Sequence, residues 1–125
     1  MRATHSVLKP RAPICFYVIT TAEDLTDAKR ERLAQRDGNE HFESRVPYDV
    51  LMDEAGFIDI ELTDVTSQYT KTLIAWKREW EADADAFVEL VGEEDFVRRI
   101  RNRNLDIVNT ADGLLQRFQV YGVKP

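Results

Sequence analysis

The fold is decided by a short apolar stretch, Ile14-Cys15-Phe16-Tyr17-Val18-Ile19. Its residues are mostly β-branched or aromatic and do not alternate with polar ones, so we expect both faces of this strand to be covered. That pattern is typical of a central strand in an α/β sheet. The preceding segment, Lys9-Pro10-Arg11-Ala12-Pro13, favours an extended or turn-forming approach. We therefore expect no earlier strand to pair with the free side of this one.

The rest of the chain predicts two helices, a strand, two helices and a last strand. The expected elements are a helix from Thr26 to Asp37, a short helix Tyr48–Ala55, a half-exposed edge strand Phe57–Thr63, a helix capped by Thr66, a helix Glu93–Asp112 and a strand Leu114–Val123. Helices and strands that alternate in this way indicate an α/β fold with few strands. We predict a single domain over residues 1–125.

Composition restricts the classes of function. The 125 residues are 43% hydrophobic and 32% charged, with a formal net charge of −6, which indicates a globular domain with a modest core. The acidic balance disfavours nucleic-acid and anionic-membrane partners. One cysteine excludes an internal disulfide and a Cys-based zinc site, and it fits a reducing compartment. No apolar run could span a bilayer, so we predict a cytoplasmic protein.

Common cofactor and metal motifs are missing. The glycines never form a G-x-G pair, so neither a dinucleotide fingerprint nor a Walker loop is present. We expect His5 and His41 to be solvated and to hold no metal, and Cys15 to be a buried, inert thiol. The basic cluster Arg98, Arg99, Arg101 and Arg103 covers more than one helical face and follows acidic residues that can pair with it. A nucleic-acid role is therefore not predicted.

One helical seam, Tyr69, Leu73, Trp76 and Trp80, allows two interpretations. It is either simply core, or the face of a helix that covers a small-molecule pocket. In open α/β sheets, ligands gather beyond the carboxyl ends of the strands. The residues that could lie on the substrate side of such a pocket are Thr20, Thr21, His41, Tyr69 and Trp76. No residue is predicted to be catalytic.

The order of these elements resembles half of a known family. Val7-Leu8-Lys9-Pro10 before an apolar strand is similar to the turn that introduces the fifth strand of class I S-adenosylmethionine-dependent methyltransferases. Glu54-Ala55-Gly56-Phe57 resembles the helix end before their sixth strand, and Arg117 to Pro125 resembles their closing seventh strand. Tyr69 and Trp76 lie in a stretch similar to the helical insertion of small-molecule members. Arg11-Ala12-Pro13 replaces the paired glycines of the family's turn.

The resemblance implies a partial Rossmann-like methyltransferase sheet of about three strands, the last antiparallel, with a two-helix insertion. It covers only the C-terminal half of the family's domain, without the strands that bind S-adenosylmethionine. We therefore expect a truncated relative of a small-molecule methyltransferase, or a gene remnant of one, that supplies the substrate side, binds no cofactor alone and is inactive alone. Two alternatives are a non-catalytic subunit or binding protein, and an unrelated small α/β domain with its own pocket.

In the family the seventh strand lies between the fifth and sixth, and the fifth also pairs with the fourth. Without a fourth strand, Ile14–Ile19 would leave an unpaired apolar edge, which favours association. The expected occupants of that edge are a second copy in a homodimer, a complementary methyltransferase half, or the first residues of the chain.

Overall fold

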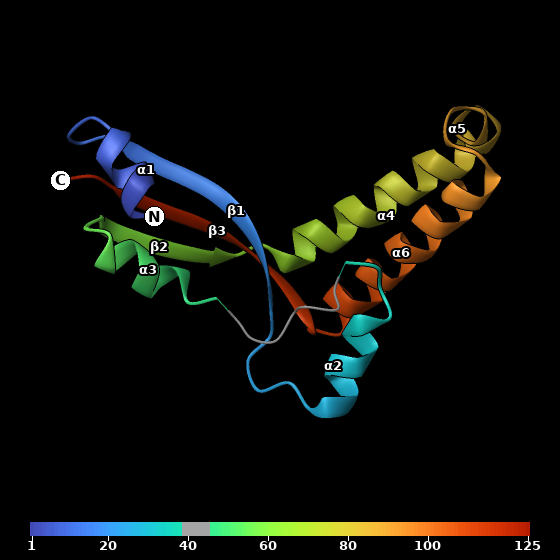
Figure 1. The fold of residues 1–125 in the computed structure, drawn as a ribbon, viewed down its shortest axis with the longest axis horizontal. Helices are drawn as coiled ribbons and strands as arrows, with labels where there is room; N and C mark the ends of the chain where they lie inside the picture. Colours follow the sequence, from blue (N-terminus) through green and yellow to red (C-terminus); the bar gives the residue numbers. More distant parts are fainter. Residues whose placement is uncertain (39–45) are drawn as a thin grey trace.

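The computed structural model describes residues 1–38 and 46–125, which form one three-stranded sheet and six helices. The strands are β1 (Pro13–Thr21), β2 (Ile58–Asp64) and β3 (Leu115–Val123). Their order is β1-β3-β2, and β3 runs antiparallel to both neighbours (Figure 1). The predicted α/β class is confirmed, as is the antiparallel last strand.

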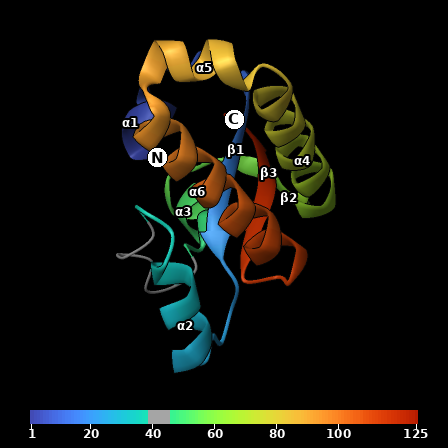
Figure 2. The ribbon, with the colours of Figure 1, turned by 90° about the vertical axis from the view of Figure 1, so that its right-hand side faces the viewer.

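The helices of the described residues lie around this sheet. They are α1 (Arg2–Val7), α2 (Asp27–Ala34), α3 (Tyr48–Glu54), α4 (Thr66–Ala82), α5 (Ala84–Val91) and α6 (Glu93–Ala111). Helices α4 and α6 lie side by side and project from the sheet, and α5 crosses their far end (Figures 1 and 2). We call α4, α5 and α6 the arm. None of the helices within the described ranges is long and apolar enough to cross a membrane.

One face of the sheet carries the main core, beneath α1 and α3. Met52, Phe57 and Val120 are almost fully buried there, at 0%, 2% and 0% exposure. The partly buried side chains around them are Met1, Leu8, Ile14, Phe16, Val18, Tyr48, Ala55, Ile60 and Leu62. Helix α1 was not predicted. It forms because Met1 and Leu8 at its two ends find apolar partners in this cluster, which a local pattern does not reveal.

The opposite face of β1 is open, and the prediction of a central strand covered on both faces is wrong. Within the described residues β1 pairs only with β3, and its side chains alternate between the core and solvent. Tyr17 is 56% exposed and Ile19 is 44% exposed. Cys15 is also exposed, not buried as expected, and its Sγ accepts a hydrogen bond from Gln119 Nε2 at 3.0 Å. The physical reason is that α1 and α3 cover one face only.

Three local expectations have different outcomes. Thr26 is the N-cap of α2, as predicted, and accepts a hydrogen bond from the Lys29 backbone N–H at 3.3 Å. Thr66 does not cap α4, since it is already helical and its hydroxyl donates to Asp64 at 2.6 Å. His5 is not solvated: its ring packs edge-on against Phe57, with ring centroids 4.9 Å apart.

Strand β2 lies at the other edge of the sheet, as predicted, although its alternation breaks at the start. Ile58 is 47% exposed instead of sharing the buried side of Ile60 and Leu62. The register shifts between Ile58 and Glu61, where Asp59 takes a positive φ of 52°. This irregularity turns the first side chain of the strand toward solvent.

Candidate functional site

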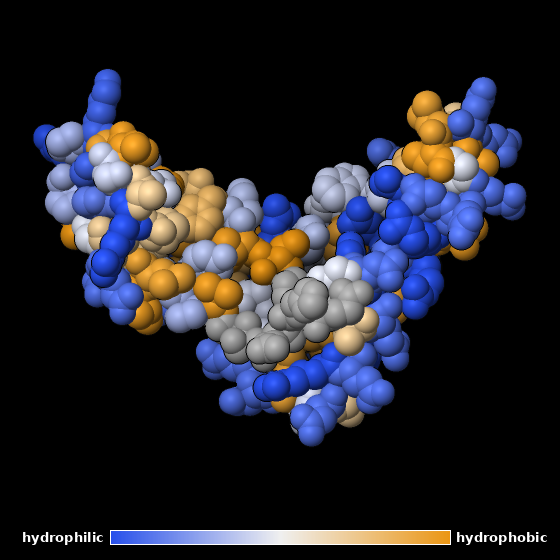
Figure 3. Space-filling model, viewed as in Figure 1, coloured by the Kyte–Doolittle hydropathy of each residue, from blue (hydrophilic) through white to orange (hydrophobic). Residues whose placement is uncertain are grey.

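A cavity of about 250 Å³ lies where the sheet, α2 and the arm meet. It is lined by Ile19, Arg36, Gly38, Tyr69, Asp106, Thr110 and Leu115. The molecule is hollowed between the sheet and the arm, and apolar surface lies at the base of that hollow (Figure 3). The cavity is next to the carboxyl end of β1, the location that the sheet rule predicts.

An ion pair forms the polar side of the cavity and ties the end of α2 to α6. Arg36 Nε donates to Asp106 Oδ1 at 2.9 Å, and a second guanidinium nitrogen donates to Oδ2 at 3.2 Å. Both side chains are largely buried, with 30% and 11% exposure. The hydrogen bonds to Asp106 raise the pKa of Arg36, against the opposite effect of burial. A two-point contact of this kind fixes the orientation of both groups.

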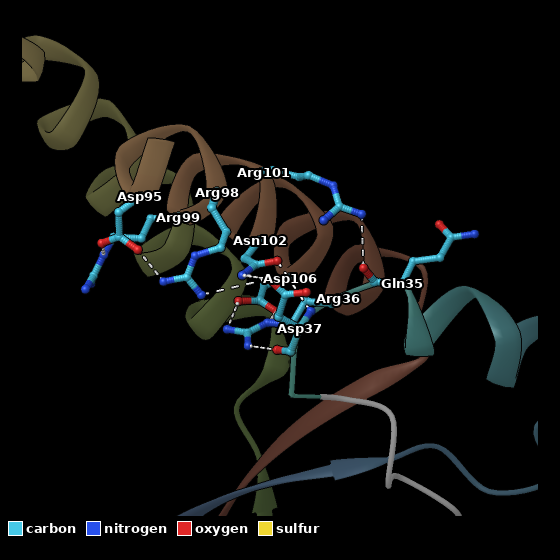
Figure 4. A network of polar contacts seen from close by, with 9 residues as sticks. All are labelled: Gln35, Arg36, Asp37, Asp95, Arg98, Arg99, Arg101, Asn102 and Asp106. Atoms are coloured by element: carbon cyan, nitrogen blue, oxygen red, sulfur yellow. Dashed lines mark hydrogen bonds and ion pairs between the residues drawn. The ribbon is translucent and has the colours of Figure 1, made fainter. Parts of the chain in front are cut away.

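A second set of contacts holds the chain that follows α2 (Figure 4). The Asn102 amide oxygen accepts from the Asp37 backbone N–H at 3.4 Å, and its Nδ2 donates to the Asp37 carboxylate at 3.3 Å. Arg101 donates to the Gln35 carbonyl at 3.2 Å. These bonds fix Gly38, the last described residue before residue 46, against the cavity.

Tyr69 presents its hydroxyl to this charged environment from the first half of α4. Burial raises its pKa and so does the negative charge of Asp106, while Arg103, Arg117 and Arg36 act in the opposite direction. The net shift is upward from the ordinary value of 10.0. Tyr69 is therefore a neutral phenol at physiological pH, able to donate a hydrogen bond to a ligand in the cavity.

Two arginines are held between pairs of aromatic rings beside the cavity. The Arg117 guanidinium carbon lies 4.7 Å from the centre of the Tyr17 ring and 4.5 Å from that of Tyr69. Arg103 lies 5.2 Å from Trp76 and 4.8 Å from Trp80. These distances are within the range of cation–π attraction. One face of each of these four rings is thus covered by a protein cation.

The predicted substrate-side residues do not all lie in one place. Tyr69 lines the cavity, whereas Trp76 lies two turns further along α4, 45% exposed. Thr20 and Thr21 are buried at the end of β1 but do not line the cavity. The Thr20 hydroxyl accepts a hydrogen bond from the Val46 backbone N–H at 3.2 Å, and the Thr21 hydroxyl has no partner among the described residues. His41 lies outside the described residues.

Arg36, Asp106 and Thr110 were missed from the sequence. Arg36 lies in a strongly polar stretch, and the helical spacing of the apolar residues of α6 indicated those as its buried face. Two of those, Val97 and Val108, are 59% and 47% exposed. The buried residues of the helix are polar instead: Asn102, Asp106, Asn109 and Thr110. Their spacing of four, three and one residues places them on one helical face, and this was the signal available in the sequence.

No group of histidine, cysteine and carboxylate side chains in the described part of the chain could hold a metal ion. The cavity suits a small ligand, since its volume lies below the roughly 300–1,000 Å³ of pockets for drug-sized molecules. Its polar groups could bind and orient such a ligand. Tyr69 could donate to it, and the Arg36–Asp106 pair could fix its position.

Comparison of the fold with solved structures finds close similarity to parts of larger proteins. Phosphoethanolamine N-methyltransferase 2 of Haemonchus contortus, solved with phosphomonomethylethanolamine and S-adenosylhomocysteine, matches with a TM-score of 0.83 over 99% of this chain, at 17% identity. A candidate sarcosine dimethylglycine methyltransferase from Galdieria sulphuraria matches with a TM-score of 0.82 over 98%, at 16% identity. The cyclopropane synthase MmaA2 from Mycobacterium tuberculosis matches with a TM-score of 0.80 over 98%, at 15% identity.

In each case the match spans less than half of the other protein. The chain covers 29%, 45% and 48% of these three proteins, respectively. No protein-family model and no curated protein sequence matches the chain. A nucleoside-sized cofactor does not fit the described cavity, which is too small and is lined by one pair of opposite charges. What the comparison establishes is the fold: this chain is folded like a part of these three proteins, two of which are named as methyltransferases and one as a cyclopropane synthase.

Proposed function

We propose that this chain supplies the substrate side of an S-adenosylmethionine-dependent methyltransferase for small molecules, and that it is inactive alone. The observation that carries the proposal is the match of nearly the whole chain to methyltransferase structures, at TM-scores of 0.82 and 0.83. The fit extends from α1 to β3, so the order of elements, the sheet and the arm all belong to the similarity. The cytoplasm is the location that we propose with it.

The chemistry of methyl transfer is compatible with the cavity. Transfer needs above all that the sulfonium carbon and the acceptor atom are aligned. A cavity with a fixed ion pair at one side and a neutral phenol at another can orient a small acceptor through Asp106, Arg36 and Tyr69. The cofactor supplies the methyl group when it is bound. We expect the residues that bind it to come from a second part of the fold.

The test is methyl transfer by the chain in complex with that second part. Tagged protein is purified from its own host, and the complex and the isolated chain are each incubated with methyl-labelled S-adenosylmethionine and a panel of small acceptors. We expect label in a small molecule with the complex and none with the isolated chain. Complexes that bind the cofactor but methylate only protein or nucleic acid would contradict the substrate class.

A second candidate function is that of a non-catalytic subunit that binds a complete methyltransferase through the free edge of β1. The observation that favours it is the exposure of apolar side chains on that strand, 56% for Tyr17 and 44% for Ile19. Strands that leave backbone groups unpaired at an edge readily add a strand from another chain. If the chain supplies the substrate side, we propose that a complementary methyltransferase half occupies the edge of β1. If it is a non-catalytic subunit, we propose that a complete enzyme occupies that edge.

Lysine substitutions on the two edge strands test whether β1, and not β2, binds the partner. Cys15→Lys places a charge on the open face of β1, and Thr63→Lys places the same charge on the opposite edge strand, β2. We expect only Cys15→Lys to weaken the complex, measured by co-purification and by light scattering. If the chain elutes as a homodimer and Cys15→Lys abolishes that dimer, the occupant of the edge is a second copy of the chain. Equal effects of both variants would exclude β1 as the binding edge.

A further inference from the structure

The surroundings of Tyr69 are positively charged, although the chain as a whole is acidic. Three arginines, Arg36, Arg103 and Arg117, and one carboxylate, Asp106, act on its phenol. Those groups sum to a local charge of +2 (three positive, one negative), in a protein whose formal net charge is −6. A local field of this sign attracts anions.

The three arginines differ in how far their hydrogen-bonding capacity is used. Arg36 is bonded to Asp106 at two points, so that pair is neutral overall. Arg103 lies 3.9 Å from the same carboxylate, and its Nε is buried without a hydrogen-bond partner among the described residues. The described residues offer the Arg117 guanidinium only the two tyrosine ring faces. Two guanidinium groups therefore retain free N–H donors beside the cavity.

Arg117 does not itself line the cavity, but it lies against two residues that do. It faces Ile19 across the β1–β3 pairing, and it stacks on Tyr69; both of those residues line the cavity. Stacking between two rings holds the plane of the guanidinium while its edge stays available to donate. A planar edge of this kind matches two oxygens of a carboxylate or a phosphate group.

We propose that the cavity beside Tyr69 binds a small oxyanion, the carboxylate or phosphate group of the methyl acceptor, with Arg117 as principal donor. Arg103 strengthens the positive potential, and the Tyr69 hydroxyl donates a further hydrogen bond. A cationic group of the acceptor would have to point away from these arginines, because like charges repel. This inference rests on the proposed function only in treating the cavity as the acceptor site.

Fluorescence provides a local readout, because the chain has two tryptophans and both lie against Arg103. The purified chain is titrated with inorganic phosphate, with acetate and with choline, at constant ionic strength and without S-adenosylmethionine. We expect a saturable change with phosphate or acetate and none with choline. A stronger response to phosphate would identify a phosphate ester as the acceptor class, and a stronger response to acetate would identify a carboxylate. No saturable response to either anion, or a response to choline alone, would overturn the proposal.

Variants assign the site. Arg117→Gln is expected to raise the dissociation constant of the anion at least tenfold, and Arg117→Lys to raise it less, since it keeps the charge but loses the planar edge. Arg30→Gln removes the same charge from an exposed position on α2 and is expected to leave binding unchanged. Equal weakening by Arg30→Gln would show nonspecific attraction and overturn the proposal. If Arg117→Gln does not fold, as judged by circular dichroism, Arg117→Lys decides: unchanged affinity then contradicts the role of Arg117. Because no cofactor is present, failure here is separate from failure of methyl transfer.

Discussion

The two faces of the sheet are built from the same three strands but differ in what covers them. On one face α1 and α3 seal Met52, Phe57 and Val120 from water. On the other, Tyr17 and Ile19 of β1 stay half-exposed, at 56% and 44%. The sealed face supplies the stability of the fold. The open face holds the cavity and its arginines.

Under the proposed function, this difference separates a face with a complete apolar core from a face that a second part of the fold would complete. Local strand pairing and the helices on one face bury enough apolar surface for a core. The open face relies instead on charged and aromatic contacts, such as the stacking of Arg117 on Tyr17 and Tyr69. In the proposed assembly, a complementary half adds to the free edge of β1 beside this face.

The largest expected effect contrasts a core residue of the sealed face with one of the open face. Met52→Ala removes a side chain with 0% exposure and is expected to cost about 2–5 kcal/mol of unfolding free energy. Ile19→Ala, at a position that is 44% exposed, is expected to cost about 1 kcal/mol or less. Urea unfolding followed by circular dichroism measures both. Equal losses would mean that the open face is as tightly packed as the sealed one.

A smaller effect distinguishes two ion pairs that join α2 and the residues just after it to the C-terminal part of α6. Arg36→Gln leaves the largely buried Asp106 without its principal partner and is expected to cost about 2 kcal/mol. Arg32→Gln removes the pair with Asp112, whose side chains are 36% and 50% exposed, and is expected to cost well under about 1 kcal/mol. The same unfolding measurement applies. A larger loss of unfolding free energy with Arg32→Gln than with Arg36→Gln would contradict the structural role of the Arg36–Asp106 pair at the cavity.

The next prediction concerns alkaline pH. The pKa of Tyr69 is raised in the folded state, mainly by burial, so its contribution to stability is complete below the unfolded value near 10.0. It is lost as pH rises through the folded pKa. Tyr69→Phe should therefore show a shallower decline of stability above pH 10 than the unmodified chain. Subtracting the ultraviolet titration of Tyr69→Phe from that of the unmodified chain gives the Tyr69 curve, and a midpoint below 10 would contradict the assigned surroundings.

The smallest effect is expected in the first turns of α6. Asp95 bonds to Arg98 and Arg99, which lowers its pKa, and the three side chains are 27%, 53% and 46% exposed. Its stabilising contribution is present above the unfolded value and lost as pH falls through the lower folded one. Asp95→Asn should leave the thermal midpoint at neutral pH unchanged within error, because exposed pairs contribute little. A clear loss of stability would show that the arm depends on its surface charges.

Much of the fold could be predicted from the sequence, because the strands and the glycines that end the helices are local patterns. The strand alternation in Leu114–Val123, the cap at Thr26 and the edge position of β2 depend on neighbouring residues only. The exposure of Cys15 could not be predicted, since an apolar run does not reveal which faces receive a cover. Helix α1 needed knowledge of distant partners for the same reason.

The candidate site was less accessible to sequence reasoning than the fold. Tyr69 was found because it belongs to an aromatic seam. Arg36 and Asp106 are far apart in the chain, and their pairing follows from the way α2 packs on α6. Arg103 was grouped with the other arginines of the basic cluster. The linear sequence does not show that two tryptophans of α4 lie against its guanidinium.

The central claim is that this chain holds the substrate side of the site without the cofactor side. Equilibrium binding of labelled S-adenosylmethionine to the purified chain tests it most directly. The account predicts no saturable binding, because the described cavity is lined for a small ligand and the sequence has no glycine-rich loop. Tight, saturable binding of the cofactor to the isolated chain would contradict it.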